Sequence, residues 1–315
     1  KYARKTLLYM HVETLKALVC WCSSMSRAFD QQGFTRILQT RALGQRLQHF
    51  DVTTSTMAVA DDLARKEGAA AAHGTVVIAE SQSAGIGRRG RSWDSEACCN
   101  LLFSLVWAPV STEGLSPALL IRQLVQLNLA APIAVVGACA AVGVGDARIK
   151  WPNDVWAGTI PKKLSGVLVN FNGKDAAVLG VGINVLQDMA DHPSATSVTT
   201  LLQEQQTSLT DGAAEVGARE AILARFCYEL ERLMALSNEE VINEYLQHDL
   251  LTGLSIRVHH RSRDEDDPRD FEALVIGLNQ DGMLRVRPAG MLEERVLSAE
   301  EISISPKFKE WKPRA

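Results

Sequence analysis

The sequence predicts an α+β fold with a separate small β module at its C-terminal end. Between residues 51 and 250, short apolar strands occur together with helices of 3.6-residue periodicity. After Leu254 the pattern changes to period two, as in Ile256 and Val258, and turn sequences such as residues 279–282 separate the segments. We therefore expect an N-terminal extension over 1–50, a main domain over 51–250 and a small antiparallel module, formed as a barrel, over 251–315.

The individual elements follow from periodicity and from capping and breaking residues. Residues 54–56 offer helix N-cap chemistry, and Gly68 ends the helix that follows them. Further helices are expected at 116–127 and 133–142, separated by Pro132, and at 213–236 and 238–248. Strands are expected at 75–79, 100–107, 148–151, 155–156, 166–170 and 177–183.

The composition is that of an ordinary soluble chain, with 315 residues, 46% apolar residues and a net charge of −4. This charge gives no whole-chain reason to expect binding to nucleic acid or to a membrane surface. Residues 1–50 differ, because they hold eight basic against two acidic side chains, a net charge of +6. Such a segment suits either an organelle transit sequence or a basic amphipathic helix packed on the next domain. We expect an intracellular protein, cytoplasmic or mitochondrial.

Cysteine and histidine are scattered along the chain. None of the six cysteines forms a C-x-x-C pair or stands at zinc-site spacing with histidines. Reduced thiols in an intracellular compartment are therefore expected, without a metal cage of His and Cys. No continuous apolar run reaches the 18 to 20 residues, roughly, that span a bilayer. Residues 129–144 come closest but contain Pro132 and Gly137, and a buried helix pair is expected there.

The segment from Gly85 to Trp93 holds three glycines and three arginines and comes shortly after an expected strand. Glycine lets the backbone come close to a ligand, and guanidinium and backbone N–H groups donate to phosphate oxygens. The pattern therefore predicts a phosphate-binding loop, although short basic glycine-rich segments also occur as solvated loops.

Three further polar segments adjoin expected strands. Residues 150–154 (Lys-Trp-Pro-Asn-Asp) form a sharp turn of a kind that is also common without a function. Lys163 precedes a buried strand, and residues 180–184 (Gly-Val-Gly-Ile-Asn) end another with small residues and a side-chain amide. Small residues in a strand allow a ligand to approach the backbone closely.

Taken in order, these motifs resemble those of the biotin protein ligases, the family of biotin–[acetyl-CoA-carboxylase] ligases and holocarboxylase synthetases. The matching segments are Ser55-Thr56, residues 80–85 (Glu-Ser-Gln-Ser-Ala-Gly), residues 87–93 (Gly-Arg-Arg-Gly-Arg-Ser-Trp), Asn100-Leu101, residues 150–154, residues 163–166 (Lys-Leu-Ser-Gly) and residues 182–184. The resemblance covers roughly residues 51–305. Each motif is weak alone, but their combination in one order is highly specific.

The resemblance implies a catalytic domain over 51–250 with a mixed sheet like that of class II aminoacyl-tRNA synthetases, and an SH3-like domain over 251–315. It also implies a two-step reaction, in which biotin and MgATP give biotinyl-5′-AMP and pyrophosphate. The adenylate then acylates a lysine of the biotin carboxyl carrier domain of a biotin-dependent carboxylase. The implied ligands are thus biotin, ATP and Mg²⁺. Neither a nucleic acid nor a membrane is expected as a partner, and a homodimer remains open.

Site roles follow from the same resemblance. Ser55, Thr56 and Gln82 would bind the ureido ring of biotin, and Asn153 would lie near the triphosphate. The ligand-binding set is completed by Met57, Gly85, Ile86, Gly87, Arg88, Arg91, Trp93, Lys163, Gly166, Gly182 and Asn184. Trp93 is expected either in the pocket wall, with Leu168 and Val181, or in the core.

The chemistry of the implied reaction explains why these residue types are needed. Negative charge accumulates on phosphoryl oxygens when a carboxylate attacks the α-phosphate, so we expect Arg88, Arg91 and Lys163 to be aimed there. Lys163 could also hold the biotin carboxylate. The adenylate is a mixed anhydride that water hydrolyses, which calls for a loop that closes over it. Asp154 could hold Mg²⁺, accept the proton of the incoming lysine, or simply cap its turn.

The sequence departs from the family pattern at three places. Ile86 stands where many relatives have arginine, and Met57 stands where asparagine is frequent, which leaves a backbone contact to biotin at that position. Residues 191–202 contain no aromatic residue except His192, so adenine packing is unassigned.

Three other functions remain open at this point. A lipoate ligase shares the fold and the adenylate chemistry. A transcriptional regulator that senses biotinyl-AMP would use a helix-turn-helix within residues 1–50, where we find no such pattern. A binding protein without catalytic activity would retain the pocket alone.

Overall fold

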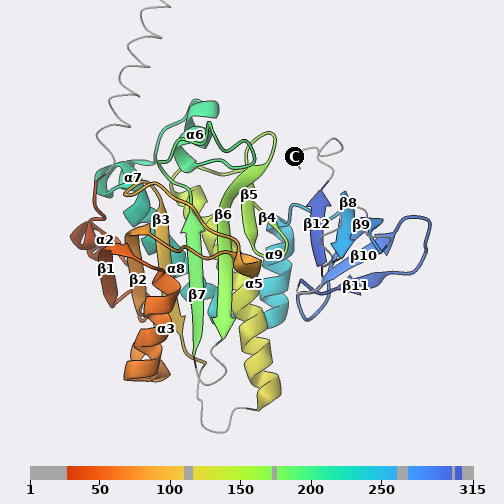
Figure 1. Ribbon diagram of the computed structural model, residues 1–315, viewed down its shortest axis with the longest axis horizontal. Helices are drawn as coiled ribbons and strands as arrows, with labels where there is room; N and C mark the ends of the chain where they lie inside the picture. The colour runs from red at the N-terminus through yellow and green to blue at the C-terminus, as the bar shows by residue number, and fades with distance from the viewer. Residues whose placement is uncertain (1–26, 110–115, 172–175, 261–268, 300–301, 307–315) are drawn as a thin grey trace, which may run out of the picture.

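The computed structural model of the chain describes residues 27–109, 116–171, 176–260, 269–299 and 302–306. These residues form two units, a seven-stranded mixed sheet flanked by helices and a five-stranded antiparallel sheet (Figure 1). The predicted α+β class is confirmed, and so is the small β module at the C-terminal end. The boundary predicted between residues 250 and 251 stays a prediction.

The larger sheet has the strand order β1-β2-β3-β7-β6-β5-β4, in which only the pair β1 and β2 is parallel. Its strands are β1 (Leu47–Thr53), β2 (Val76–Gln82), β3 (Leu101–Trp107), β4 (Arg148–Lys150), β5 (Asp154–Ala157), β6 (Lys162–Phe171) and β7 (Ala177–Ile183). Successive side chains of β2 enter different cores, with Val76 and Ile78 on one face and Val77 on the other. Because both faces are covered there, β3 and β7 consist almost entirely of apolar residues and glycine.

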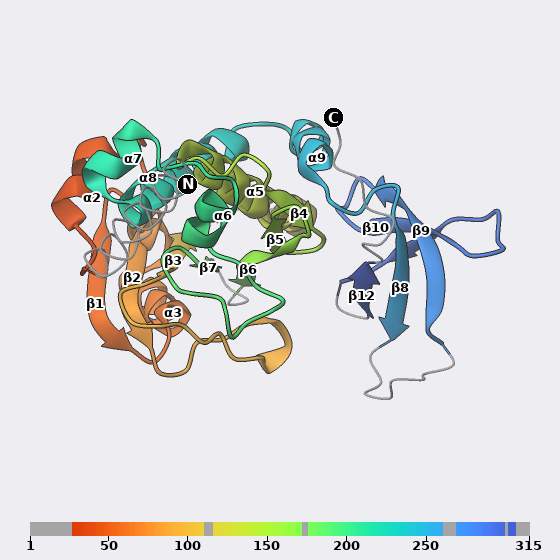
Figure 2. The ribbon, with the colours of Figure 1, turned by 90° about the horizontal axis from the view of Figure 1, so that it is seen from above.

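Figure 2 shows that α5 and α8 cover one face of this sheet and that α3 covers the other. The helices are α2 (Gln31–Ile37), α3 (Thr56–Glu67), α4 (Ala69–Ala72), α5 (Pro117–Ala141), α6 (Val198–Glu204), α7 (Asp211–Val216), α8 (Ala218–Met234) and α9 (Asn238–His248), with a 3₁₀ turn η1 (Arg88–Gly90). Phe103 of β3 meets Phe226 of α8 edge to face, with ring centroids 5.0 Å apart. Such ring pairs add to the burial of apolar area between sheet and helix.

The expected helix pair around Pro132 is in fact one continuous helix, α5, and this prediction was wrong. A proline inside a helix costs about 3 kcal/mol, because it removes a hydrogen bond and crowds the preceding turn. The residues around it, including Leu129 and Ile133, are buried against the sheet and α8. Each fully buried aliphatic side chain contributes about 1.5–3 kcal/mol, so packing outweighs the cost of the proline. By length and composition α5 could also cross a membrane, but 67% of its most apolar window is buried inside the molecule.

Three other boundaries differ from the prediction. The limit set between residues 50 and 51 falls inside β1, so residues 47–50 belong to the sheet. The strand expected at 75–79 continues to Gln82, because β1 pairs with it along this whole length. The helix expected at 213–236 is broken at Gly217, whose φ of 111° is open to glycine without strain.

Free thiols are found at the four cysteines that the structure describes, Cys98, Cys99, Cys139 and Cys227. Cys20 and Cys22 lie outside the described residues, as does most of the basic extension. The prediction of a transit segment or a helix there stays a prediction.

The smaller sheet has the order β11-β10-β9-β8-β12, formed by β8 (Ser255–His260), β9 (Phe271–Leu278), β10 (Leu284–Pro288), β11 (Arg295–Leu297) and β12 (Ile302–Pro306). It is tied to the end of the larger sheet near β4. The indole of Trp151 donates a hydrogen bond of 3.0 Å to the carbonyl of Gly282, and Leu250 N donates one of 2.8 Å to the carbonyl of Ile149. This attachment brings β12 to the edge of the site described next.

Candidate active site

A cavity of about 370 Å³ opens over the face of the larger sheet that carries α3. Its walls come from the start of α3, the end of β2, the loop 83–99, strands β3, β6 and β7, and the turn between β4 and β5. Ile304 of β12 also lines it, so the smaller sheet contributes to the wall. Segments that are far apart in the sequence therefore meet at one site, as the expected ligand-binding set requires.

Most of the predicted site residues line this cavity. They are Ser55, Thr56, Met57, Gln82, Ile86, Gly87, Arg88, Arg91, Trp93, Asn153, Asp154, Lys163, Gly166 and Gly182, together with the predicted wall residues Leu168 and Val181. Gly85 and Asn184 are not in the wall. The side-chain amide of Asn184 donates 3.0 Å to the carbonyl of Thr196, and its backbone N–H donates 3.0 Å to that of Leu164. Asn184 thus holds the chain behind Lys163 rather than facing the cavity.

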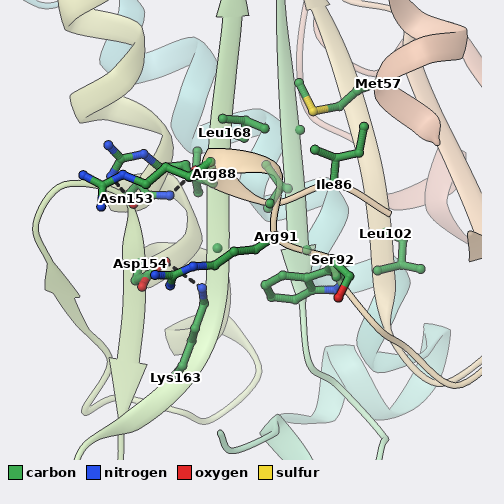
Figure 3. Close-up of a pocket in the computed structure, with 18 of the residues that line it drawn as sticks. Met57, Ile86, Arg88, Arg91, Ser92, Leu102, Asn153, Asp154, Lys163 and Leu168 are labelled. Atoms are coloured by element: carbon green, nitrogen blue, oxygen red, sulfur yellow. Dashed lines mark hydrogen bonds and ion pairs between the residues drawn. The ribbon is translucent and has the colours of Figure 1, made fainter. Parts of the chain in front are cut away.

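The cavity has an apolar part and a charged part (Figure 3). Met57, Leu168 and Leu102 carry apolar side chains in its wall. Arg91 points toward Asp154 and Lys163, across the strands from the apolar group. A ligand with a hydrophobic body and an anionic end would match this division.

Glycines in β6 and β7 leave room for the cavity wall. A Cβ on Gly182 would lie only 2.5 Å from Cε2 of Trp93, and one on Gly166 would lie 3.0 Å from Cζ3 of the same ring. The indole therefore packs directly on the backbone of these two strands. A Cβ on Gly180 would lie 2.5 Å from the sulfur of Met57, so Met57 packs on β7 in the same manner. The motif glycines are needed because the wall side chains occupy the space of a Cβ.

Polar groups at the start of α3 are already organised by one another. The side-chain oxygen of Gln82 accepts a hydrogen bond of 2.8 Å from the backbone N–H of Thr56. The hydroxyl of Thr56 also lies 2.8 Å from that of Ser104, and Ser55 and Thr56 are both buried. A short array of donors and acceptors thus lines one side of an otherwise apolar pocket, as a neutral polar ligand group would need.

The loop that carries the arginines forms a small hairpin over the cavity. Gly87 N donates 2.7 Å to the carbonyl of Arg91, and Ile86 and Ser92 form a β-bridge. At the tip, Arg89 and Gly90 both have positive φ, of 61° and 70°. A positive φ is uncommon at an arginine, and strained residues of this kind cluster at active sites and ligand-binding loops.

Arg88 joins three parts of the molecule. Its guanidinium donates 3.1 Å to the side-chain oxygen of Asn153 and 2.7 Å to the carbonyl of Ala299. Asn153 in turn donates 2.6 Å to the carbonyl of Val167 in β6. The loop, the turn after β4 and the chain before β12 therefore hold Arg88 at the cavity mouth. No sequence pattern indicated the contact to Ala299, because the two residues lie 211 positions apart.

Lys163 and Asp154 form an ion pair of 2.8 Å between neighbouring strands. The ammonium of Lys163 also lies 5.3 Å from the ring centroid of Trp93, a cation–π contact. The backbone of Lys163 is fixed by hydrogen bonds of 3.0 Å to Ser194 and of 2.9 Å from Thr196. Thus the lysine is positioned between the indole and the carboxylate.

Asp154 is the one carboxylate that the described part of the chain brings into the cavity wall. No group of three or more potential metal ligands occurs among the described residues. This donor set does not form a protein cage for a metal, but it fits Mg²⁺ carried mainly by substrate phosphates and water.

A buried ionic network supports the base of the arginine loop, and sequence reasoning missed it. Glu80 and Arg219 are each 3% exposed and form an ion pair of 2.6 Å. The carboxylate also lies 2.7 Å from Nε2 of His49 and accepts 2.6 Å from the backbone N–H of Phe29. Burial raises the pKa of Glu80, but the hydrogen bond from Arg219 and the contacts to Phe29 and His49 lower it by more. The pKa of Glu80 is therefore lowered. The acidic residue in the motif at 80–85 was the available signal.

Comparison with known proteins agrees with this geometry. Residues 49–188 match the family described as the biotin/lipoate A/B protein ligase family. The chain is 32% identical over 226 residues to the biotin–[acetyl-CoA-carboxylase] ligase of Mycobacterium tuberculosis. This match covers 68% of the present chain and 76% of the relative. The chain belongs to the biotin/lipoate protein ligase family. Bifunctional ligase/repressor BirA of Bacillus subtilis is another relative of this family, 33% identical over 61% of this chain. The chain spans 55% of that relative's length.

Solved structures show the fold of the family. Biotin protein ligase from Aquifex aeolicus, in complex with biotin and ATP, superimposes with a TM-score of 0.61 at 23% identity, over 84% of this chain and 100% of the other. The Leishmania major enzyme in complex with biotinyl-5-AMP gives a TM-score of 0.52 at 25% identity, over 81% and 99% of the two chains. Both units of the present chain, the mixed sheet and the small β module, therefore fit within the architecture of biotin protein ligases.

Proposed function

We propose that this chain is an ATP-dependent biotin–protein ligase that forms biotinyl-5′-AMP and transfers biotin to a lysine of a carboxyl carrier domain. The observation that supports this most is the single cavity wall that combines an apolar part with Arg88, Arg91 and Lys163. Relatives named as biotin ligases, and family members solved with biotin, ATP or biotinyl-5-AMP, support the same ligands. The substrate carboxylate and the nucleotide phosphate would meet where the two parts join.

In the first step a carboxylate oxygen of biotin bonds to the α-phosphorus and pyrophosphate leaves. Negative charge grows on the phosphoryl oxygens, so preorganised cations lower the barrier. Arg88 and Arg91 would supply this charge from the arginine loop and Lys163 from β6. Thr56 and Gln82 would hydrogen-bond the ureido ring, and Trp93 would cover the ring system of biotin.

In the second step the amine of an acceptor lysine attacks the acyl carbon of the adenylate and AMP leaves. Asp154 could orient this amine and accept its proton, although in the structure it is engaged by Lys163 at 2.8 Å. Binding of the substrate anions to Lys163 would weaken that pair and release the carboxylate. Mg²⁺, which would neutralise triphosphate charge, would be held by Asp154 and the phosphates.

The decisive experiment incubates the purified chain with ATP, Mg²⁺, biotin and an acceptor carrier domain and detects biotinylated acceptor by streptavidin blotting. We expect biotin transfer that requires the acceptor lysine and all three small ligands. Competition between biotin and lipoate tests the substrate, and lipoate labelling in preference to biotin would make the chain a lipoate ligase. Absence of both products, together with absence of biotin-dependent exchange of pyrophosphate into ATP, would contradict ligase activity altogether.

The partners and location remain part of the proposal. The acceptor would be the carrier domain of a biotin-dependent carboxylase, reached in the cytoplasm or in mitochondria, with neither nucleic acid nor a membrane as partner. A gel shift with upstream DNA at stated salt tests the regulatory alternative, since nonspecific binding falls steeply with salt. A homodimer would be detected by light scattering during size-exclusion chromatography.

A further inference from the structure

Lys150 is a basic residue of the cavity wall that the roles above leave unused. It is the last residue of β4 and stands directly opposite Asp154 in the register of β4 and β5. Its half-buried side chain lines the same cavity as Arg91 and Lys163. The ammonium lies 4.7 Å from the ring centroid of Trp156, whose π face partly compensates for lost water.

Positive charge exceeds negative charge in this wall. The described lining holds five basic side chains, Arg88, Arg89, Arg91, Lys150 and Lys163, against the one carboxylate of Asp154. That carboxylate is engaged by Lys163 at 2.8 Å, and the structure describes no carboxylate within ion-pair distance of Lys150. Burial lowers the pKa of Lys150; Asp154 opposes this effect, and Lys163 and Arg91 add to it. This excess of positive charge in the wall favours an anionic ligand.

The geometry indicates where that anion would lie. Lys150 and Lys163 approach Asp154 from neighbouring strands, one opposite it in β4 and the other paired with it from β6. A phosphoryl group between the two ammonium groups would relieve their repulsion and accept charge-assisted hydrogen bonds from both. The carboxylate of biotin carries a single negative charge and loses it once the adenylate forms, whereas the phosphoryl group stays charged through both steps.

We propose that Lys150 is a further catalytic residue, whose ammonium contacts the α-phosphate of ATP and then the phosphate of the adenylate. The inference rests on the proposed function. In the first step the bond from the biotin oxygen to phosphorus forms and the bond to the pyrophosphate oxygen breaks. In the second step the amide bond forms, the acyl carbon–oxygen bond breaks, and the electron pair leaves with AMP. Lys150 stabilises the phosphate charge in both steps and transfers no proton.

The test compares two biotin–adenosine conjugates that differ in the charge of their linker, with free biotin as a third ligand. Isothermal titration measures the affinity for biotin and for two stable biotin–adenosine conjugates, one with a phosphodiester linker and one with an uncharged linker. Lys150→Met removes the ammonium and keeps the length of the side chain, whereas Lys150→Arg keeps the charge. Lys162→Met is the matched control, because Lys162 is a half-buried neighbour of Lys163 that does not line the cavity.

We expect Lys150→Met to lower the affinity for the phosphodiester conjugate by about 10- to 100-fold, which is the scale of one charge-assisted hydrogen bond. Affinity for biotin and for the uncharged conjugate should change less than about twofold. Lys150→Arg should restore most of the lost affinity, and Lys162→Met should match the unsubstituted protein with all three ligands. Single-turnover transfer from preformed adenylate to the acceptor should slow in Lys150→Met by a similar factor.

If Lys150→Met lowers the affinity for both conjugates equally, Lys150 only supports the cavity wall. If the affinity for the phosphodiester conjugate is unchanged, Lys150 does not contact the phosphate. Either result overturns the inference. If Lys150→Met does not fold, as judged by its thermal unfolding, Lys150→Gln takes its place in the same comparison. An unsubstituted protein that binds neither biotin nor the conjugates would overturn the proposed ligase function as well. If the unsubstituted protein binds biotin and both conjugates, and Lys150→Met binds the phosphodiester conjugate with the same affinity, only the role of Lys150 is overturned.

Discussion

Replacing Gly182 by alanine should push Trp93 out of the cavity wall. The new Cβ would lie 2.5 Å from Cε2, 2.7 Å from Cζ2 and 2.9 Å from Nε1 of the indole. Carbon atoms in van der Waals contact lie about 3.5–4.0 Å apart, so the distance between the new Cβ and the indole must increase by roughly 1 Å. The central strand β7 is held by β3 and β6 on both sides, whereas Trp93 belongs to a loop. The indole should therefore move, and Lys163, which lies over its ring, should lose its contact.

The size of the effect follows from overpacking, which costs about 1–3 kcal/mol in a well-packed site. If this cost falls on the ligand-binding state, biotin affinity should drop by about 5- to 150-fold. Global stability should change less, because the loop can yield without unfolding the sheet. Calorimetric titration with biotin and thermal unfolding measure the two effects separately.

The matched control is Gly145→Ala, because a Cβ on Gly145 would meet no atom within 4 Å and the residue does not have a positive φ. We expect this variant to bind biotin normally. Equal biotin affinity in Gly182→Ala and Gly145→Ala would refute the packing argument.

Three further predictions concern charge and pH. Arg88→Ala and Lys163→Ala should each slow biotin-dependent pyrophosphate exchange by about 10²-fold or more, the loss expected for one transition-state donor; normal exchange in both variants would remove them from the chemistry. Glu80→Gln should lower the free energy of unfolding by about 3–5 kcal/mol, because it leaves Arg219 buried without its partner; denaturant unfolding measures this, and a loss below 1 kcal/mol, roughly, would contradict it. Burial lowers the pKa of His73 from its ordinary 6.5, so the unfolded chain binds more protons below that pH and the free energy of unfolding should fall as the pH drops below 6.5. Denaturant unfolding of His73→Gln should show a smaller decrease over the same pH range, and an identical decrease would contradict the assignment.

The motifs along the chain include most of the residues that line the cavity, because each motif combines a particular backbone requirement with a chemical group. The sequence predicts Gly182 as a small residue near the end of a strand, whereas Gly166 is predicted by the family resemblance alone; the indole of Trp93 occupies the space of a side chain at both. The sequence predicts Lys163 as a cation before a strand; it lies within β6 and lines the cavity. Asn184 has the same local pattern but faces away from the cavity, since its amide bonds with the chain behind Lys163.

Residue types and local periodicity determined the α+β class, the central strands, the small β module and the family motifs. The tertiary structure alone decided that α5 runs through Pro132, that Asp154 pairs with Lys163, and that Arg88 reaches the carbonyl of Ala299. The physical reason is the separation along the chain over which each kind of interaction acts. Strand and helix signals act over a few neighbouring residues, whereas these outcomes depend on which distant segments the sheet order and the buried packing bring together.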